Sequence, residues 1–197
     1  TMISHDEVSR LRRTLSENVL LVIDQAYGEF ADDYNDPVRT FELVDQGNTV
    51  VTRSLSKAYG LAGIRVGWGY FPKELATQMR KVLNPNNISV PAQAMATAAM
   101  RDQKHMRSIV HRTIEIRERF ADECRALGLD VPQSHTNFVL IRFPSSEIAA
   151  DADRQLRAHK LALRGMGPYG LAECLRATVC HQETMDRCLK GLKEVMR

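Results

Sequence analysis

The chain has 197 residues, of which 44% are hydrophobic and 26% charged, and its 27 Lys and Arg against 24 Asp and Glu give a formal net charge of +3. Such a composition is globular and excludes collagen-like, low-complexity and disordered chains. The small charge excludes a nucleic-acid binder, and the longest apolar runs are too short to span a bilayer. Because the first residues are polar and charged, without a signal-peptide pattern, we expect a cytoplasmic protein.

The four cysteines are spaced without a C-x-x-C pair or a zinc-finger pattern. We therefore expect no metal site and no disulfide framework, and we expect the cysteines to be small buried hydrophobes. A metal pair formed by Cys180 and His181 is a weaker alternative. The four positions are Cys124, Cys174, Cys180 and Cys188.

The first predicted elements are a helix and a strand. Ser4, with Glu7 three residues later, fits a helix-capping box, and apolar residues at helical spacing follow it. The apolar run 19–23 is rich in β-branched residues, which is typical of a strand buried on both faces in a parallel sheet covered by helices. Asp24 stands at the carboxyl end of this strand, where open α/β sheets bind ligands.

The following elements complete an α/β pattern. We expect a strand at 49–53, a polar loop at 54–63, a strand at 65–71 with Trp68 in the core, a helix beginning at Pro72, a break at 84–87 and a helix at 90–100.

A smaller α+β unit is predicted after a domain boundary near residue 104. Its elements are a long helix at 105–127, a strand at 138–143, a helix at 147–159, a strand at 175–180 and a helix at 184–196. The chain thus divides into residues 1–104 and 105–197.

A lysine-containing loop carries the most specific chemical pattern. Two hydroxyls, Ser54 and Ser56, precede Lys57, and Arg65 follows eight positions later. Hydroxyls and a guanidinium are groups that bind a phosphate. A lone lysine in such a loop is usually a solvated charge. Its combination with Asp24 and nearby Tyr27 is far more specific.

These residues belong to segments that resemble the fold-type-I pyridoxal-phosphate aminotransferases, most closely the histidinol-phosphate aminotransferase group. The matching segments are 24–30, 54–68, 134–138 and 175–179. The resemblance implies an α/β fold, in which 1–104 is part of the large, doubly wound cofactor-binding domain and 105–197 is the small α+β C-terminal domain.

The resemblance also implies roles for individual residues toward pyridoxal 5'-phosphate. Lys57 would form a Schiff base with the cofactor and then act as the general base, Asp24 would pair with the pyridine nitrogen, and Tyr27 would hydrogen-bond the phenolic oxygen. The cofactor phosphate would be held by Ser54, Ser56 and Arg65.

For the substrate, the resemblance implies that Arg176 binds an anionic group, assisted by Arg164 and Asn137. Two of these positions have a plainer interpretation. Arg176 lies in an alternating strand and could face solvent, and Asn137 could be a turn residue before a strand. The implied partners are an amino donor and a 2-oxo acid, in a homodimer, with neither nucleic acid nor membrane.

Three departures from the family pattern limit the match. Gln25 stands where the group often has Glu, and Cys180 where Gly is usual. Full members also have an N-terminal portion that this sequence lacks, so the chain resembles their C-terminal part. Two alternative functions follow: an inactive fragment that acts only as a folded or associating unit, and a decarboxylase of a phosphorylated amino acid that uses the same cofactor.

Overall fold

The computed structural model describes residues 2–31 and 37–196, which form two compact units, Met2–Val110 and His111–Arg197. The division falls inside one helix, α5 (Gln103–Ala126). The domain boundary near residue 104 therefore stays a prediction. No helix within the described residues combines the length and apolar character needed to cross a membrane.

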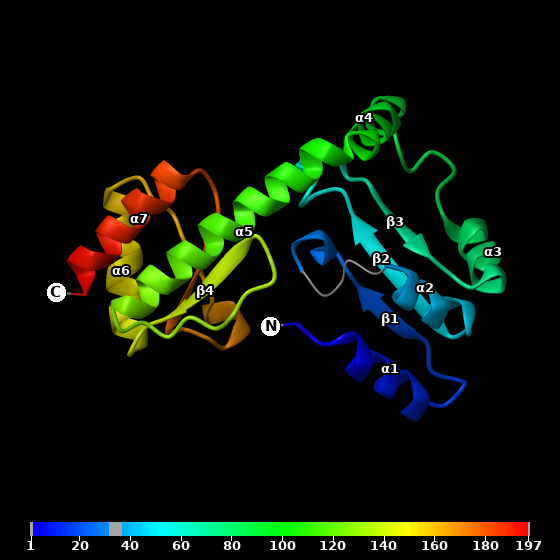
Figure 1. The fold of residues 1–197 in the computed structure, drawn as a ribbon, viewed down its shortest axis with the longest axis horizontal. Coiled ribbons are helices and arrows are strands. Elements are labelled where there is room, and N and C mark those ends of the chain that lie inside the picture. Colours follow the sequence, from blue (N-terminus) through cyan, green and yellow to red (C-terminus); the bar gives the residue numbers. More distant parts are fainter. Residues whose placement is uncertain (1, 32–36, 197) are drawn as a thin grey trace. The chain divides into compact units, whose positions relative to one another are not determined.

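The first unit contains a three-stranded sheet with the order β1 (Leu21–Asp24), β2 (Thr49–Ser54) and β3 (Gly67–Tyr70) (Figure 1). β1 and β2 are parallel, with Asp24 opposite Thr52, and β3 runs antiparallel to β2. The crossover between the parallel strands contains α2 (Pro37–Asp45), which the sequence analysis did not predict. Because β1 and β2 are parallel, the loops after Asp24 and Ser54 leave from the same edge of the sheet.

Three further helices belong to this unit: α1 (His5–Thr14), α3 (Lys73–Val82) and α4 (Val90–Arg101). The predicted capping box is confirmed, because the Ser4 hydroxyl accepts from the Glu7 amide and the Glu7 carboxylate accepts from the Ser4 amide. Pro72 is the N-cap of α3 rather than its first residue. Two short 3-10 helices, η1 (Gly28–Phe30) and η3 (Ala62–Ile64), lie in the loops that follow β1 and β2.

The apolar run 19–23 is only partly buried, which corrects the prediction of a strand buried on both faces. Ile23 packs in a core with residues of α1, α2 and β2, while Val22 is 55% exposed. Successive side chains of a strand point to opposite faces, so the described residues cover one face of β1 only. Trp68 was also predicted wrongly as core: it is 38% exposed, with its ring 6.2 Å from that of Phe41.

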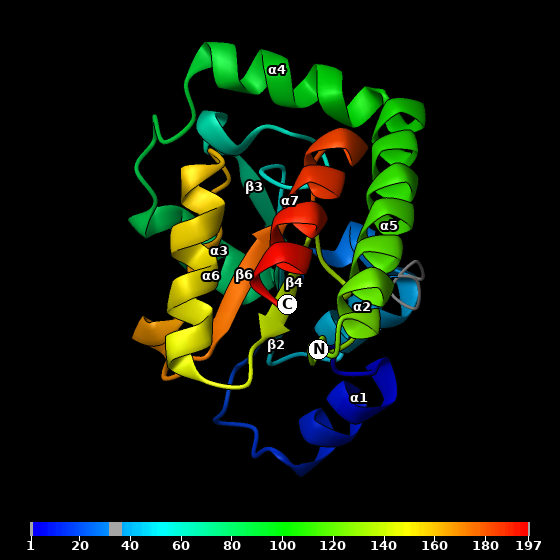
Figure 2. The ribbon, with the colours of Figure 1, turned by 90° about the vertical axis from the view of Figure 1, so that its left-hand side faces the viewer.

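The second unit is a small antiparallel sheet with the order β4 (Phe138–Arg142), β6 (Cys174–Thr178) and β5 (Arg164–Gly165). Helices α6 (Ser146–Ala158) and α7 (Gln182–Val195) pack against each other beside this sheet (Figure 2). The two-residue strand β5 is too short for a periodic pattern and was not predicted. A 3-10 helix, η4 (Gly167–Tyr169), follows it.

One continuous core fills the second unit and includes two cysteines. Cys124 and Cys188 belong to this core and Cys174 is fully buried, as expected of small hydrophobes. Cys180 is exposed, so the prediction of burial was wrong for it. It follows the end of β6, where the chain leaves the sheet for α7.

Candidate functional site

Asp24 ends β1 and shapes the loop that follows. Its Oδ1 accepts a hydrogen bond from the Ala26 amide at 2.9 Å and lies 3.5 Å from the Thr52 hydroxyl on β2. The amide of Gly28 donates to the carbonyl of Gln25 at 2.9 Å, which turns the chain into η1. The carboxylate is exposed and is therefore free to meet a ligand at the edge of the sheet.

Lys57 comes from the loop after β2 and meets the loop after β1. The Ser54 hydroxyl accepts a hydrogen bond from the Ser56 amide at 3.1 Å, and the Leu55 side chain is only 1% exposed. This hydrogen bond and the burial of Leu55 anchor the start of the loop. The Lys57 Nζ lies 5.1 Å from the centroid of the Tyr27 ring. That distance is within the range of a cation–π interaction. The contact joins the two loops that carry the predicted cofactor residues.

Arg65 holds an unusual backbone conformation. Its φ of 60° and ψ of 46° are left-handed, a region that costs a non-glycine residue about 1 to 2 kcal/mol. The guanidinium donates to the carbonyl of Ala62 at 2.7 Å and lies 3.5 Å from the Ser56 hydroxyl. The strained backbone thus directs a cation toward the hydroxyl that precedes Lys57, and such strain is concentrated at functional sites.

The predicted cofactor residues therefore lie on adjoining loops of the first unit. Together they offer an amine, a phenol, a carboxylate, hydroxyls and a guanidinium, which is a donor set that fits an aldehyde-bearing pyridine phosphate. Contacts within the set join Lys57 with Tyr27, Ser54 with Ser56, and Ser56 with Arg65. The individual roles stay predictions.

The predicted substrate residues belong to the second unit, where two arginines face each other. Arg164 and Arg176 are direct partners across β5 and β6. The Arg176 Cζ lies 4.7 Å from the centroid of the Phe138 ring, and its Nε is buried without a hydrogen-bond partner. Arg164 donates to the Tyr169 hydroxyl at 2.9 Å. Because like charges directly opposite destabilise a sheet, an anion bound between them would stabilise this arrangement.

Asn137 immediately precedes β4, and its backbone carbonyl accepts from the Val179 amide at 2.9 Å. This contact is compatible with the plainer interpretation of a residue at the start of a strand. Its predicted role toward the substrate stays a prediction.

The sequence analysis missed Arg117, which supports the turn that contains Asn137. Arg117 is 3% exposed, donates to the Thr136 carbonyl at 3.0 Å and forms an ion pair with Glu118 at 2.7 Å. A usable signal was present in the sequence. Arg117 lies on the same helical face as Phe120 and Cys124, where an arginine is unexpected unless its donors are satisfied.

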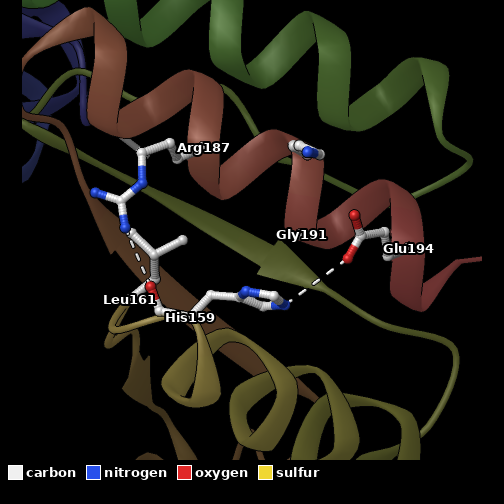
Figure 3. Close-up of a pocket in the computed structure, with 6 residues that line it drawn as sticks. His159, Leu161, Arg187, Gly191 and Glu194 are labelled. Atoms are coloured by element: carbon white, nitrogen blue, oxygen red, sulfur yellow. Dashed lines mark hydrogen bonds and ion pairs between the residues drawn. The ribbon is translucent and has the colours of Figure 1, made fainter.

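Two cavities have linings that include none of the predicted cofactor residues. One of about 250 Å³ lies in the first unit and is lined by Tyr59, Ala98, Ala99, Asp102, His105 and Met106. The other, of about 190 Å³, lies in the second unit between the end of α6 and α7 (Figure 3). There the His159 ring faces Glu194 at 3.8 Å, and Arg187 donates to the His159 carbonyl at 3.1 Å (Figure 3). None of the residues predicted to bind cofactor or substrate lines either cavity.

Comparison with known sequences gives consistent matches. A family model described as aminotransferase class I and II matches residues 1–192. The histidinol-phosphate aminotransferase of Rhodopseudomonas palustris strain BisA53 is 39% identical over 200 residues, covering 100% of this chain and 54% of that protein. That of Jannaschia sp. strain CCS1 is 40% identical over 192 residues, covering 98% of this chain and 53% of that protein. The chain thus spans about half the length of the curated relatives it matches.

Comparison with solved structures agrees. The histidinol-phosphate aminotransferase of Sinorhizobium meliloti, solved in complex with pyridoxal-5'-phosphate, matches with a TM-score of 0.88 and 30% identity, covering 100% of this chain and 54% of that one. This likeness confirms the α/β fold class predicted from the sequence, a part of the fold-type-I architecture.

Proposed function

Because the chain belongs to the class I and II aminotransferases, we propose that it moves an amino group between an amino donor and a 2-oxo acid, with pyridoxal 5'-phosphate bound at Lys57. The observation that carries this proposal is the 5.1 Å contact between the Lys57 amine and the Tyr27 ring. This contact joins the end of β1 and the segment after it, which supply the Asp24 carboxylate and the Tyr27 phenol, to the end of β2 and the loop after it. That second region supplies the Lys57 amine and the serine hydroxyls.

Each predicted cofactor residue has a task that its chemistry allows. The Asp24 carboxylate would pair with the protonated ring nitrogen, and the Tyr27 hydroxyl would donate to the phenolic oxygen. Ser54 and Ser56 would donate hydroxyl hydrogens to the phosphate, and Arg65 would neutralise its charge. The Arg65 guanidinium lies 3.5 Å from the Ser56 hydroxyl, which supports this grouping.

Lys57 performs two tasks in the proposed reaction. Pyridoxal phosphate, when bound, would supply an aldehyde that condenses with an amine and a ring that withdraws the electron pair left when the substrate loses its Cα proton. The Lys57 amine would hold the cofactor, and when free its Nζ would take the Cα proton of the substrate and return it at a different carbon. The anchored turn at Ser54 and Leu55 keeps the amine close to the site throughout.

For the substrate we propose an amine that carries a phosphate, like histidinol phosphate. The support is the name shared by the relatives and the facing pair Arg164 and Arg176, whose two guanidinium groups suit a doubly charged anion. Asn137 would assist at the same sheet. A carboxylate of the 2-oxo acid would use the same arginines in the reverse half of the reaction.

We also propose a cytoplasmic homodimer. The four cysteines are free thiols, which suits a reducing compartment. Apolar side chains of the first unit are exposed, among them Val22 at 55% and Val82 at 78%, and such residues mark surfaces that another chain covers.

Reductive labelling tests the proposed function. The purified chain is incubated with pyridoxal phosphate, reduced with borohydride and digested, and the pyridoxyl-modified peptides are mapped. We expect the label on Lys57, and its loss in Lys57→Arg but not in Lys73→Arg. A label distributed over other lysines would refute the assignment.

Parallel assays of amino transfer and of carbon dioxide release distinguish a transaminase from a decarboxylase.

A second candidate function is that of a folded unit that associates without catalysis. It is favoured by the exposed apolar residues and by the match to only about half of each relative. Failure of the chain to gain thermal stability from pyridoxal phosphate would support this candidate.

A further inference from the structure

One buried cluster of charged and polar groups lies beside the proposed site and has no role in it. We infer that Arg53 is a positioning residue, which with Gln25 and Glu29 locks the loop that carries Asp24 and Tyr27 onto the strand that leads to Lys57. The inference rests on the proposed function, because the loops it joins are those assigned to the cofactor.

The guanidinium of Arg53 holds both sides of the turn that contains Tyr27. Its Nε donates to the side-chain oxygen of Gln25 at 2.9 Å, and its Nη1 forms an ion pair with Glu29 at 3.2 Å. Gln25 comes two residues before Tyr27 and Glu29 two residues after it. A single planar group thus fixes the turn from both ends, which a lysine ammonium could not do with the same geometry.

Burial makes this attachment rigid. The side chains of Arg53 and Glu29 are only 11% and 12% exposed, and Gln25 is 4% exposed with its amide 3.5 Å from the Thr40 hydroxyl. Water therefore competes poorly for these hydrogen bonds, and breaking one would leave a buried charge without its partner.

Gly28 shows how closely the guanidinium approaches the turn. A Cβ placed on Gly28 would lie 2.9 Å from the Arg53 Nη1 and 3.0 Å from its Cζ. Any side chain at this position would therefore push the guanidinium away. Since Gly28 has no side chain, the guanidinium packs directly on the backbone that follows Tyr27.

The charge balance of the cluster depends on Glu29. Gln25 contributes a neutral amide, so the carboxylate of Glu29 supplies the charge opposite Arg53. Among the residues that the structure describes, loss of Glu29 would thus leave the buried guanidinium with only the amide oxygen of Gln25. The ion pair of Arg53 and Glu29 orients the loop directly. It acts on the proposed reaction only by positioning Asp24, Tyr27 and Lys57.

Three variants separate positioning from simple stability. Arg53→Gln removes the cation and leaves Glu29 charged, whereas the double variant Arg53→Gln with Glu29→Gln removes both charges. Arg53→Lys keeps the charge and loses the planar fork. Arg12→Lys is the matched control, because the Arg12 guanidinium also joins separate segments by hydrogen bonds, in its case to backbone carbonyls that include those of Val19 and Asn48, but at the other end of β1 and β2.

Amide hydrogen exchange without cofactor is the first measurement. We expect the amides of residues 26–31 to exchange on the order of tenfold faster in Arg53→Gln and in the double variant, and less so in Arg53→Lys. The double variant should recover most of the melting temperature lost in Arg53→Gln. The Arg12→Lys control should leave exchange at 26–31 unchanged.

The affinity for pyridoxal phosphate and the rate of Lys57 labelling are the second measurement. We expect the double variant to bind the cofactor on the order of tenfold more weakly, although its stability is restored. Wild-type exchange and affinity in the double variant would overturn the inference and leave the cluster purely structural. If the wild-type chain is not labelled at Lys57, the proposed function fails, while exchange at 26–31 still decides whether Arg53 holds the loop.

Discussion

The charge of Asp24 is the single-residue feature on which the proposed chemistry depends most. A full negative charge about 4 Å from a pyridinium contributes roughly 4 kcal/mol at an effective dielectric near 20. The carboxylate already accepts from the Ala26 amide and lies near the Thr52 hydroxyl, so its orientation is set before any cofactor binds. The role proposed for Asp24 toward the cofactor is therefore electrostatic.

The substitution Asp24→Asn tests that role. The amide keeps an acceptor for Ala26 but loses the charge, so we expect amino transfer to slow by about a thousandfold, at about 1.4 kcal/mol for each factor of ten. Asp45→Asn is the control. Asp45 accepts from the Tyr70 hydroxyl at 2.6 Å and raises the pKa of Tyr70, and its loss should lower that pKa without changing the rate. Equal rates for Asp24→Asn and the wild type would refute the assignment.

At the scale of elements, the pairing of β5 with β6 creates the proposed anion site. Arg164 and Arg176 repel across the two strands, and the buried Nε of Arg176 lacks a partner. Inorganic phosphate should therefore raise the melting temperature of the wild-type chain.

That stabilisation by phosphate should disappear in Arg176→Gln. Arg142→Gln is the matched control, because Arg142 lies on the same sheet but is already paired with Asp130 at 2.8 Å. A phosphate-induced shift of the same size in all three proteins, measured by calorimetry, would show that the arginine pair binds no anion.

Helices α5 and α7 contribute two thiols whose ionisation is coupled to folding. Burial raises the pKa of Cys124 and of Cys188 from 9.0 to about 12. A pKa that is higher in the folded state gives stability that is complete below pH 9 and is lost as the pH rises toward 12. Each thiol should then reduce the free energy of unfolding by about 1.4 kcal/mol per pH unit within this window.

Urea unfolding at pH 8 and pH 10 measures this loss, and Cys188→Ala should lose less stability over the same interval than the wild type. Identical slopes for the wild type and Cys188→Ala would contradict the assigned pKa.

Most elements could be predicted from sequence because their signals are local. The capping box of α1 and the helical periodicity of α5 both depend on residues that are close together in the sequence. The short strand β5, by contrast, exists only through its pairing with β6. Likewise the cluster of Gln25, Glu29 and Arg53 is formed by one residue on β2 and two in the segment that follows β1, and nothing in the sequence brings them together. The Lys57 segment could be recognised from the sequence because several chemically active residue types lie close together there in a combination that is rare.

On the scale of the whole molecule, the first unit has more apolar surface than its own described residues cover. β1 and β3 each pair with β2 alone within residues 2–31 and 37–196, so both outer edges of this sheet lack a partner there. Exposed apolar residues lie on β1, α3 and α4 of the same unit. Open edges and apolar surface favour association with another chain.

The purified chain should therefore self-associate, and light scattering coupled to size-exclusion chromatography measures this. Val22→Thr together with Val82→Gln should lower the average mass, because both side chains are more than half exposed. Ile148→Gln, on α6 of the second unit, is the control and should change nothing. A monodisperse monomer at high concentration would contradict this prediction.

The central claim is that Asp24 and Lys57 meet the same cofactor ring, and a crystal structure of the protein with pyridoxal phosphate tests it most directly. The account predicts continuous density from the Lys57 Nζ to the cofactor and the Asp24 carboxylate about 3 Å from the ring nitrogen. Density for the ring at another lysine, or an Asp24 side chain turned away from it, would contradict the account.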